Sequence, residues 1–327
     1  MIYVHVPFCR SFCTYCDFYS ERACPSAKWL DEVCSEALAR KDEIAASAAV
    51  NTLYIGGGTP SVLPLDYIAR IADACGGRSY SEWTVEVNPD DITRDYAGGL
   101  KALGVNRISM GVQSLDDAML RWMNRRHSAS GARSAFGMLR EAGFDNISVD
   151  IIFGVNGMSR VMLQDTLREI LEWRPEHVSA YQLSVEEGSA LGRLVRGGRY
   201  TELSDEECSA QYYLICSMLA AAGYEHYEIS NWALPGFRAV HNSAYWTRAP
   251  YVGLGSSAHS LRRNPDVRSW NSDTLSGWTS SSEVLTSEEI REEQIMLGLR
   301  TAEGIPGYGR IPEDRWFTAD SIIAGLI

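Results

Sequence analysis

Short apolar runs rich in β-branched residues alternate with longer stretches of helical period through the first part of the chain. The runs predict six strands, at Ile2–Val6, Thr52–Ile55, Thr84–Val87, Arg107–Gly111, Ile147–Phe153 and Val178–Leu183. The stretches between them predict five helices, at Lys28–Ala46, Pro64–Cys75, Thr93–Leu103, Ala129–Ala142 and Met162–Trp173. This alternation is typical of parallel β/α units.

The pattern changes near residue 200 and predicts two domains, residues 1–200 and 201–327. The second part is predicted to hold helices at Asp205–Ala222 and Ser287–Leu299, with an irregular stretch rich in Trp and Tyr between them, at 224–278. Within it, the polar segment Ser276–Ser282 predicts an exposed loop. The six β/α units of the first part fit either a doubly wound sheet or an incomplete TIM-like barrel, which differ in strand order.

Composition narrows the functional classes. The 327 residues carry a formal charge of 30 − 42 = −12, and 45% of them are apolar. Affinity for nucleic acid comes largely from Lys and Arg neutralising phosphates, so this charge argues against a nucleic-acid partner. No run approaches the roughly 18 apolar residues of a membrane span, and the N-terminus lacks the layout of a signal peptide. We therefore expect a cytoplasmic protein.

Three of the eight cysteines are crowded together in MIYVHVPFCRSFCTYCDFYS, where Cys9, Cys13 and Cys16 have the spacing C-x3-C-x2-C. Soft thiolates at this spacing suit an iron–sulfur cluster or zinc. A structural zinc site needs four protein ligands, and His5 is the nearest candidate for the fourth. Three ligands to a four-iron cluster leave one iron open to a small molecule, so we favour the cluster.

The motif on the loop after a first strand resembles the radical S-adenosylmethionine (SAM) superfamily. The preceding Tyr3-Val-His-Val-Pro-Phe-Cys9 resembles the branch that contains oxygen-independent coproporphyrinogen III oxidases (HemN type) and haem chaperones (HemW type). The resemblance implies an α/β fold, a partial (β/α)6 TIM-like barrel followed by a smaller α+β C-terminal region. It also implies a 4Fe-4S cluster and SAM bound to its open iron.

Further motifs match the family's SAM-contacting positions. The run Gly56-Gly-Gly-Thr-Pro60 follows the second strand, and the resemblance implies that its Gly57, Gly58 and Thr59 touch the methionyl end of SAM. Taken alone, the run indicates only a tight turn. The remaining positions that the resemblance assigns to SAM are Tyr3, Tyr15, Phe18, Glu86, Gln113, Arg125 and Asp150.

The chemistry of these side chains suits SAM. The carboxylates of Glu86 and Asp150 can accept hydrogen bonds from ribose hydroxyls, and Gln113 can both donate and accept. The planar fork of Arg125 suits the SAM carboxylate. The family usually has Gly-Leu-Pro after the Asp strand, whereas this chain has Gly154-Val-Asn156, so that loop departs from the pattern.

Oxidase and chaperone share this SAM site, and three features favour the chaperone. The oxidase type has a further cysteine two residues after the third ligand, where this chain has Phe18. The oxidase type also has an N-terminal extension, whereas the first strand here is predicted from residue 2. The third feature is the segment His241-Asn242-Ser-Ala-Tyr245-Trp246, which matches the chaperone motif H-N-x-x-Y-W.

The resemblance implies that His241, Asn242, Tyr245 and Trp246 hold haem, with His241 as an iron ligand. Imidazole is a common axial ligand, and Tyr and Trp offer flat apolar surfaces. Without the resemblance, the segment indicates a hydrogen-bonded histidine beside an aromatic pair. His259, in a segment similar to the branch's YxGxGxxAHS, is a second candidate ligand or a structural histidine.

The sequence therefore predicts a haem chaperone that delivers haem to respiratory proteins and carries a cluster and SAM. The alternative is an oxygen-independent coproporphyrinogen III oxidase, and a zinc-stabilised binding module is a third hypothesis. Peripheral contact with a membrane follows from the chaperone role, although no strongly basic amphipathic helix is evident. Related chaperones continue beyond the region that ends at Thr301 into a small helical domain, so we expect a short, divergent or truncated C-terminal end.

Overall fold

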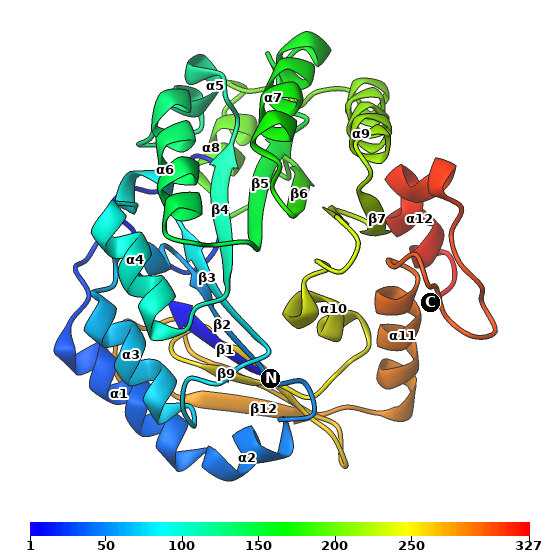
Figure 1. Ribbon diagram of the computed structural model, residues 1–327. Coiled ribbons are helices and arrows are strands. Elements are labelled where there is room, and N and C mark those ends of the chain that lie inside the picture. The colour runs from blue at the N-terminus through cyan, green and yellow to red at the C-terminus, as the bar shows by residue number, and fades with distance from the viewer.

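The computed structural model describes residues 1–327 and is built around one large curved sheet (Figure 1). Its strand order is β7-β8-β6-β5-β4-β3-β2-β1-β9, with β1 to β6 parallel and in chain order. The bounds of these six are β1 Ile2–Val6, β2 Thr52–Gly57, β3 Glu82–Val87, β4 Arg107–Gln113, β5 Ile147–Phe153 and β6 His177–Gln182. All six predicted strands are confirmed.

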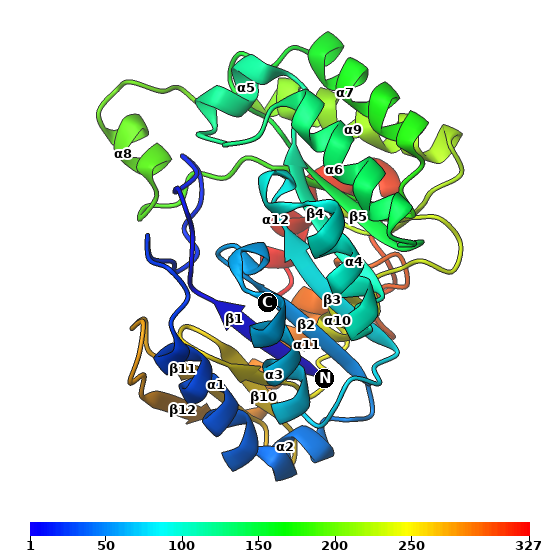
Figure 2. The ribbon, with the colours of Figure 1, turned by 60° about the vertical axis from the view of Figure 1, so that its left-hand side comes forward.

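Helices cover the outer face of this sheet (Figures 1 and 2). In chain order they are α1 Ala27–Ala39, α2 Lys41–Ala46, α3 Leu65–Ala74, α4 Arg94–Leu103, α5 Asp117–Trp122, α6 Ala129–Glu141 and α7 Arg160–Trp173, with short 3-10 turns η1 Pro60–Val62 and η2 Pro89–Asp91. The prediction of a single helix over Lys28–Ala46 is wrong in one respect, because the helix is interrupted at Arg40 and forms two helices, α1 and α2. There the backbone leaves the helical region, and the Arg40 guanidinium donates to the carbonyl of Gly253 at 2.8 Å.

The strands alternate between apolar residues that face the helices and polar residues that face the interior. Val85, Ile108 and Val149 are fully buried in the apolar core, while Glu86 and Arg107 line a cavity enclosed by the sheet. A doubly wound sheet is covered by helices on both faces and has apolar side chains on both. The polar concave face and the strand order confirm the predicted partial (β/α)6 barrel.

Beyond β6 the chain continues with α8 Ala190–Arg196 and α9 Asp205–Ala221 and then adds strands at both edges of the sheet. The further elements are β7 Glu225–Glu228, β8 Asn231–Ala233, α10 Val240–Trp246, β9 Val252–Leu254, β10 His259–Arg262, β11 Val267–Asn271, β12 Ser280–Val284, α11 Ser287–Gly298, η3 Glu313–Thr318 and α12 Ala319–Ala324. β8 pairs antiparallel with β6, and β9 pairs parallel with β1. β10, β11 and β12 form a separate antiparallel sheet.

The irregular stretch predicted over 224–278 is therefore wrong, because it contains α10 and five strands. These strands are three to five residues long, too short for a clear alternation, and several are stabilised by pairing with distant strands. The loop predicted at Ser276–Ser282 is wrong in part, since Ser280 begins the exposed strand β12.

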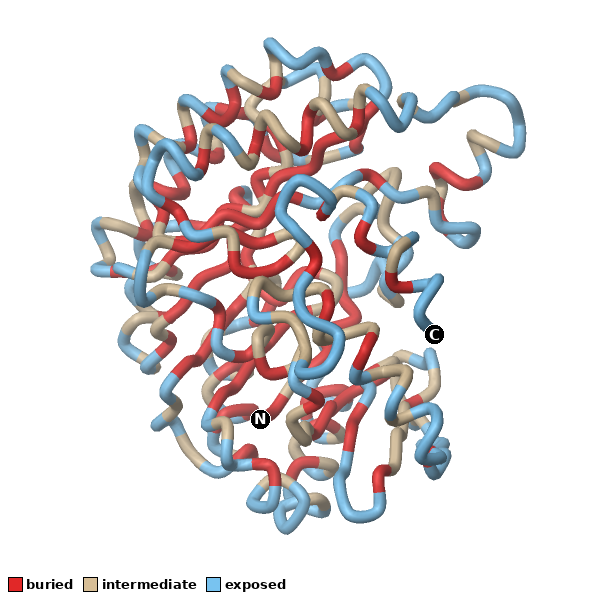
Figure 3. Tube along the Cα trace, turned by 90° about the vertical axis from the view of Figure 1, so that its right-hand side faces the viewer, coloured by how far each residue is buried: buried red, intermediate tan, exposed pale blue.

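One apolar core joins the barrel to the later elements. It runs from the strands through Tyr212 of α9 to Trp316 and Ile323 near the C-terminus. Figure 3 shows the buried segments concentrated along the strands and the exposed ones along the outer helices and loops. The division into domains at residue 200 stays a prediction. None of the helices has the length and apolar character needed to cross a membrane.

Candidate functional site

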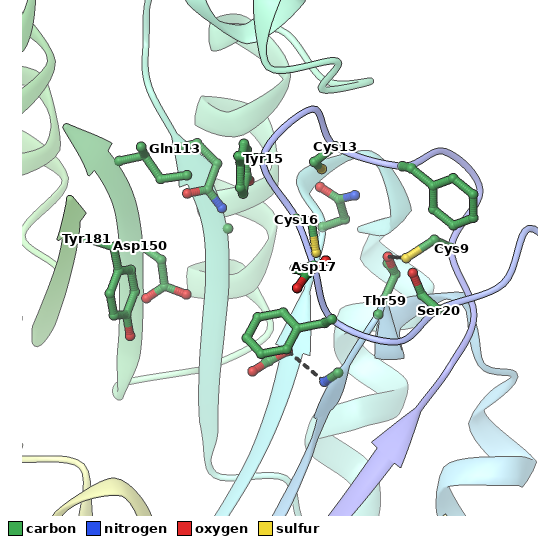
Figure 4. Close-up of a pocket in the computed structure, with 18 of the residues that line it drawn as sticks. Cys9, Cys13, Tyr15, Cys16, Asp17, Ser20, Thr59, Gln113, Asp150 and Tyr181 are labelled. Carbon is green, nitrogen blue, oxygen red and sulfur yellow. Dashed lines mark hydrogen bonds between the residues drawn. The ribbon is translucent and has the colours of Figure 1, made fainter. Parts of the chain in front are cut away.

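A cavity of about 940 Å³ opens at the carboxyl ends of the parallel strands (Figure 4). The cysteine loop that follows β1 covers it on one side, and Cys9, Cys13 and Cys16 all line it. The Cys9 Sγ lies 3.3 Å from the Thr59 Oγ1, and Arg125 Nη1 donates to the Cys13 Sγ at 3.3 Å. The structure therefore brings the three predicted cluster ligands together at one wall of one cavity.

The cysteine loop is fixed in place by backbone hydrogen bonds to distant segments. The amide of Thr14 donates to the carbonyl of Met123 at 3.1 Å, and the amide of Leu191 donates to the carbonyl of Thr14 at 2.8 Å. Asn124 Nδ2 donates to the carbonyl of Phe12 at 2.6 Å. The chain after β4 and the segment at the start of α8 thus hold the loop over the barrel, as Figure 2 shows for α8.

The donor set suits an iron–sulfur cluster. No three His, Cys, Asp or Glu side chains are placed to hold a single metal ion. The cysteines of a four-iron cluster each bind a different iron, so they need to surround a cluster and not to meet at one ion. His5 points elsewhere: its Nε2 donates to the carbonyl of Tyr19 at 2.8 Å, and its Nδ1 then accepts from the Tyr3 hydroxyl at 3.0 Å.

Most residues that sequence assigns to SAM lie on the same cavity. Nine of the ten line it, namely Tyr15, Phe18, Gly57, Gly58, Thr59, Glu86, Gln113, Arg125 and Asp150. Tyr3 does not line it and lies inside the barrel beside Tyr54, with ring centroids 6.1 Å apart. The structure thus brings together residues from β2, β3, β4, β5 and the cysteine loop. Tyr3 lies further from the carboxyl ends of the strands, at the level of Tyr54.

The glycines of the run after β2 are required by close packing. Gly57 has φ +110°, and a Cβ there would come within 2.8 Å of the His5 ring. A Cβ on Gly58 would lie 2.9 Å from the carbonyl oxygen of Phe8 and 3.0 Å from the Cys9 Sγ. Only glycine lets this turn approach the cysteine loop so closely.

Two half-buried carboxyl groups are held by neutral donors. The Tyr54 hydroxyl donates to one Glu86 oxygen at 2.7 Å, and the amide of Gly57 donates to the other at 3.2 Å. Burial raises the pKa of Glu86 to about 7. Ser109 and Ser148 donate to the two oxygens of Asp150 at 2.8 and 3.0 Å, and burial raises its pKa as well. Both carboxyl groups are therefore fixed without a direct ion pair.

Arg125 spans the gap between the cysteine loop and β4. Its Nη2 donates to the carbonyl of Gly111 at 2.7 Å and to the Asn88 side chain, while its Nε is buried without a partner. Nearby, Gln113 has φ +66°, and the β4–β5 register shifts between Gly111 and Gln113. Such a bulge re-aims a side chain, and Figure 4 shows the Gln113 amide directed into the site.

The H-N-x-x-Y-W motif forms α10, which lies inside the open side of the barrel (Figure 1). His241 is buried, with Nδ1 2.8 Å from the Thr52 Oγ1 and Nε2 3.0 Å from the Tyr245 hydroxyl. Burial lowers its pKa to about 3. Of the four motif residues, only Asn242 lines the cavity. In this conformation His241 is a hydrogen-bonded histidine with neither ring nitrogen free.

The second predicted haem ligand lies elsewhere. His259 is exposed on β10, and its ring stacks on Trp270 of β11, with centroids 6.3 Å apart. It does not line the cavity. His259 therefore neither lines the cavity with the cysteines nor takes part in the hydrogen bonds of His241.

The chain is similar to known proteins in both sequence and fold. A family model described as the Radical SAM superfamily matches residues 3–170. A heme chaperone HemW from Bacillus subtilis is 33% identical over 321 residues, covering 93% of this chain and 84% of the relative. The HemW of Lactococcus lactis is 32% identical and covers 93% and 82%. The chain belongs to the HemW family of the radical SAM superfamily.

A solved relative supports the fold of this family member. Coproporphyrinogen III oxidase (HemN) from Escherichia coli, described as a radical SAM enzyme, superposes with a TM-score of 0.73 at 21% identity. The match covers 92% of this chain and 75% of the oxidase. At that identity the likeness concerns the barrel and its C-terminal additions, and not the reaction.

Sequence reasoning missed several charged residues that line the cavity of this HemW-family protein, and one of them is buried. Arg107, the first residue of β4, lines the cavity and is 1% exposed. A charged residue opening an apolar central strand was an available signal, because such positions exclude charge unless it is paired or binds a ligand. Asn88 and Tyr54, which hold Arg125 and Glu86, were missed as well.

Proposed function

We propose that this protein is a haem chaperone that carries a 4Fe-4S cluster and SAM and delivers haem to respiratory proteins. The observation that carries the proposal is the shared cavity: the three cysteines and Asn242 of the H-N-x-x-Y-W motif line the same space. The names of the HemW relatives, heme chaperones, support the same role. Phe18, 72% exposed at the position of the oxidase's further cysteine, argues against the oxidase.

In the part of the site that would hold the cluster and SAM, each group of residues would bind a different part of these cofactors. Cys9, Cys13 and Cys16 would hold the cluster, which when bound supplies an open iron to the amino and carboxylate groups of SAM. Arg125 would direct its guanidinium to the SAM carboxylate, and the narrow Gly57–Thr59 turn would accommodate the methionyl end. Glu86 and Asp150 would accept from the ribose hydroxyls, since neither is spent on an ion pair.

Cluster binding is tested on single cysteine variants reconstituted anaerobically with iron and sulfide. We expect Cys13→Ser to lose the broad visible absorbance and most of the bound iron. Cys208→Ser is the matched control, because Cys208 is a buried thiol of α9 that lies outside the cavity, and it should retain both. Wild-type protein that takes up zinc but shows no cluster absorbance would instead support the zinc-stabilised module.

The haem half of the site requires a movement of α10, because His241 is buried and does not line the cavity. His241 can present Nε2 to a haem iron only when its hydrogen bond with Tyr245 breaks, because Thr52 occupies the other nitrogen. Asn242 faces the cavity without such a change. We therefore propose that Asn242 contacts haem first, that His241 ligates the iron once α10 has moved, and that Tyr245 and Trp246 then flank the porphyrin.

A haem titration of three variants tests this order. Tyr245→Phe removes the competitor for His241 Nε2, so we expect it to bind haem more tightly than the wild type, by about threefold to tenfold. His241→Ala should bind more weakly and change the haem absorbance, and Asn242→Ala should slow binding. Haem binding indifferent to His241 would remove this residue as a ligand and leave the chaperone role standing.

The oxidase alternative is decided by the reaction product. Reconstituted protein is incubated anaerobically with SAM, a reductant and coproporphyrinogen, and 5′-deoxyadenosine and porphyrin products are measured. The chaperone proposal expects no decarboxylated product, whereas decarboxylation of the propionates would establish the oxidase. We further propose a cytoplasmic location with peripheral membrane contact at the acceptor; all eight cysteines are unpaired, as in reducing compartments.

A further inference from the structure

Arg107 is a buried cation with no partner. Its guanidinium forms no ion pair, and its Nε and Nη1 atoms are buried without a hydrogen-bond acceptor. It is 1% exposed, yet it lines the cavity that the cysteine loop covers. A buried charge is costly unless it is paired, so this arrangement indicates a missing anion.

The nearby carboxyl groups do not supply that anion. The oxygens of Glu86 accept hydrogen bonds from Tyr54 and the amide of Gly57, and those of Asp150 accept from Ser109 and Ser148. Both carboxyl groups attract Arg107 from a longer distance, but neither lies within ion-pair distance, so the Nε and Nη1 atoms of Arg107 have no acceptor among them.

The position of Arg107 separates it from the proposed site for the SAM carboxylate. Thr84 of β3 pairs with Arg107 at the start of β4, whereas Met110, three residues further, pairs with Val87. Arg125, which bonds to Gly111 and Cys13, stands at the other, carboxyl end of β4. Of the four arginines that line the cavity, Arg125 lies beside the cysteine loop, Arg126 and Arg193 are exposed, and Arg107 alone is buried deep in the barrel.

We infer that Arg107 binds a carboxylate of a second ligand, and, resting on the proposed function, that this carboxylate is a haem propionate. A guanidinium offers a planar fork of N–H donors that matches a carboxylate. The walls near it carry flat aromatic rings, Tyr54 and Tyr181, which suit a porphyrin edge. Asn242, from the haem motif, lines the same cavity.

The test combines a change in the protein with a change in the ligand. Haem and haem dimethyl ester, which lacks both free carboxylates, are titrated into reconstituted wild type, Arg107→Gln and Arg107→Lys. We expect the wild type to bind haem at least about tenfold more tightly than the ester. Arg107→Gln should lose this preference while binding the ester as the wild type does, and Arg107→Lys should keep part of it.

Two controls make the outcomes distinct. SAM binding and cluster absorbance are measured on each variant, and both should match the wild type. If Arg107→Gln instead weakens SAM binding and leaves the haem preference intact, Arg107 serves the cofactor and the inference is overturned. Should Arg107→Gln fail to fold, the wild-type comparison of haem with its ester still decides, because equal affinities overturn the inference.

The same titrations separate this inference from the function on which it rests. Wild type that binds haem and its ester equally well keeps the chaperone proposal and removes the role of Arg107. If the wild type binds neither haem nor its ester, the chaperone proposal and the role of Arg107 are both overturned.

Discussion

Individual buried side chains in this protein lack the partners that burial normally requires. Glu228, on β7, is 1% exposed, and its Oε1 has no hydrogen-bond partner. Burial raises its pKa to about 7, although hydrogen bonds from Asn231 and Ser230 act in the opposite direction. In the folded protein the group therefore holds its proton up to near-neutral pH.

This pKa predicts a loss of stability with rising pH. Between pH 5 and pH 8 the unfolded chain releases the Glu228 proton before the folded protein does, so the free energy of unfolding falls. Relative to Glu228→Gln, the wild type should lose about 2–3 kcal/mol over this range. Urea unfolding of both proteins at the two pH values measures the difference, and parallel behaviour would contradict the raised pKa.

At the scale of elements, α10 depends on a carboxylate from the barrel. The two oxygens of Glu82, the first residue of β3, accept the amides of Val240 and His241, each at 2.8 Å. Helix N-termini leave such amides without intrahelical partners, and a buried anion there is favourable. The start of β3 therefore anchors the helix that carries the H-N-x-x-Y-W motif.

Substitution of Glu82 should loosen α10 without unfolding the barrel. Glu82→Gln leaves one acceptor for two amides, so we expect faster hydrogen exchange across α10 and a loss of about 1–3 kcal/mol in stability. Thr286→Ala removes the cap of α11 and is the control. It should lower stability by about 1 kcal/mol and leave exchange in α10 unchanged. Equal exchange in α10 of both variants would contradict the anchor.

At the scale of the whole molecule, one buried arginine joins three distant segments. Arg248, in the loop after α10, is 2% exposed and bonds to Asp266 at 2.9 Å and to Glu293 at 2.8 Å. Asp266 precedes β11, and Glu293 lies in α11. The ion pairs therefore hold the small sheet and the C-terminal helices against the barrel.

Removing the cation should destabilise this assembly. Arg248→Met removes the buried partner of two carboxylates that keep only the more exposed Arg263 and Arg268, and we expect a loss of about 2–3 kcal/mol in the free energy of unfolding. Replacing Asp266 and Glu293 by leucine in the same variant should recover much of it. Chemical denaturation gives both values, and a loss below about 1 kcal/mol for Arg248→Met would mean that the network is not stabilising.

The sequence by itself determined the features that depend only on residues close together in the chain. The cysteine spacing, the glycine run and the six strands are local, because each depends on a few contiguous side chains. The strands also carried a sign of the barrel, since Glu86, Arg107 and Ser148 alternate with apolar residues, whereas a doubly wound sheet is apolar on both faces. Family motifs then selected ten residues for SAM, and nine of these ten line one cavity in the structure.

Only the tertiary structure decided what depends on distant partners. Tyr245 binds one nitrogen of His241 from within the motif, but Thr52, which binds the other, comes from a distant strand that no pattern near residue 241 shows. The short strands β8 and β9 exist because β6 and β1 offer them edges. Arg107 lacks an acceptor because Glu86 and Asp150 are positioned by other donors and lie beyond ion-pair distance from it. Burial and pairing are set by residues far apart in the chain, so they follow from the fold.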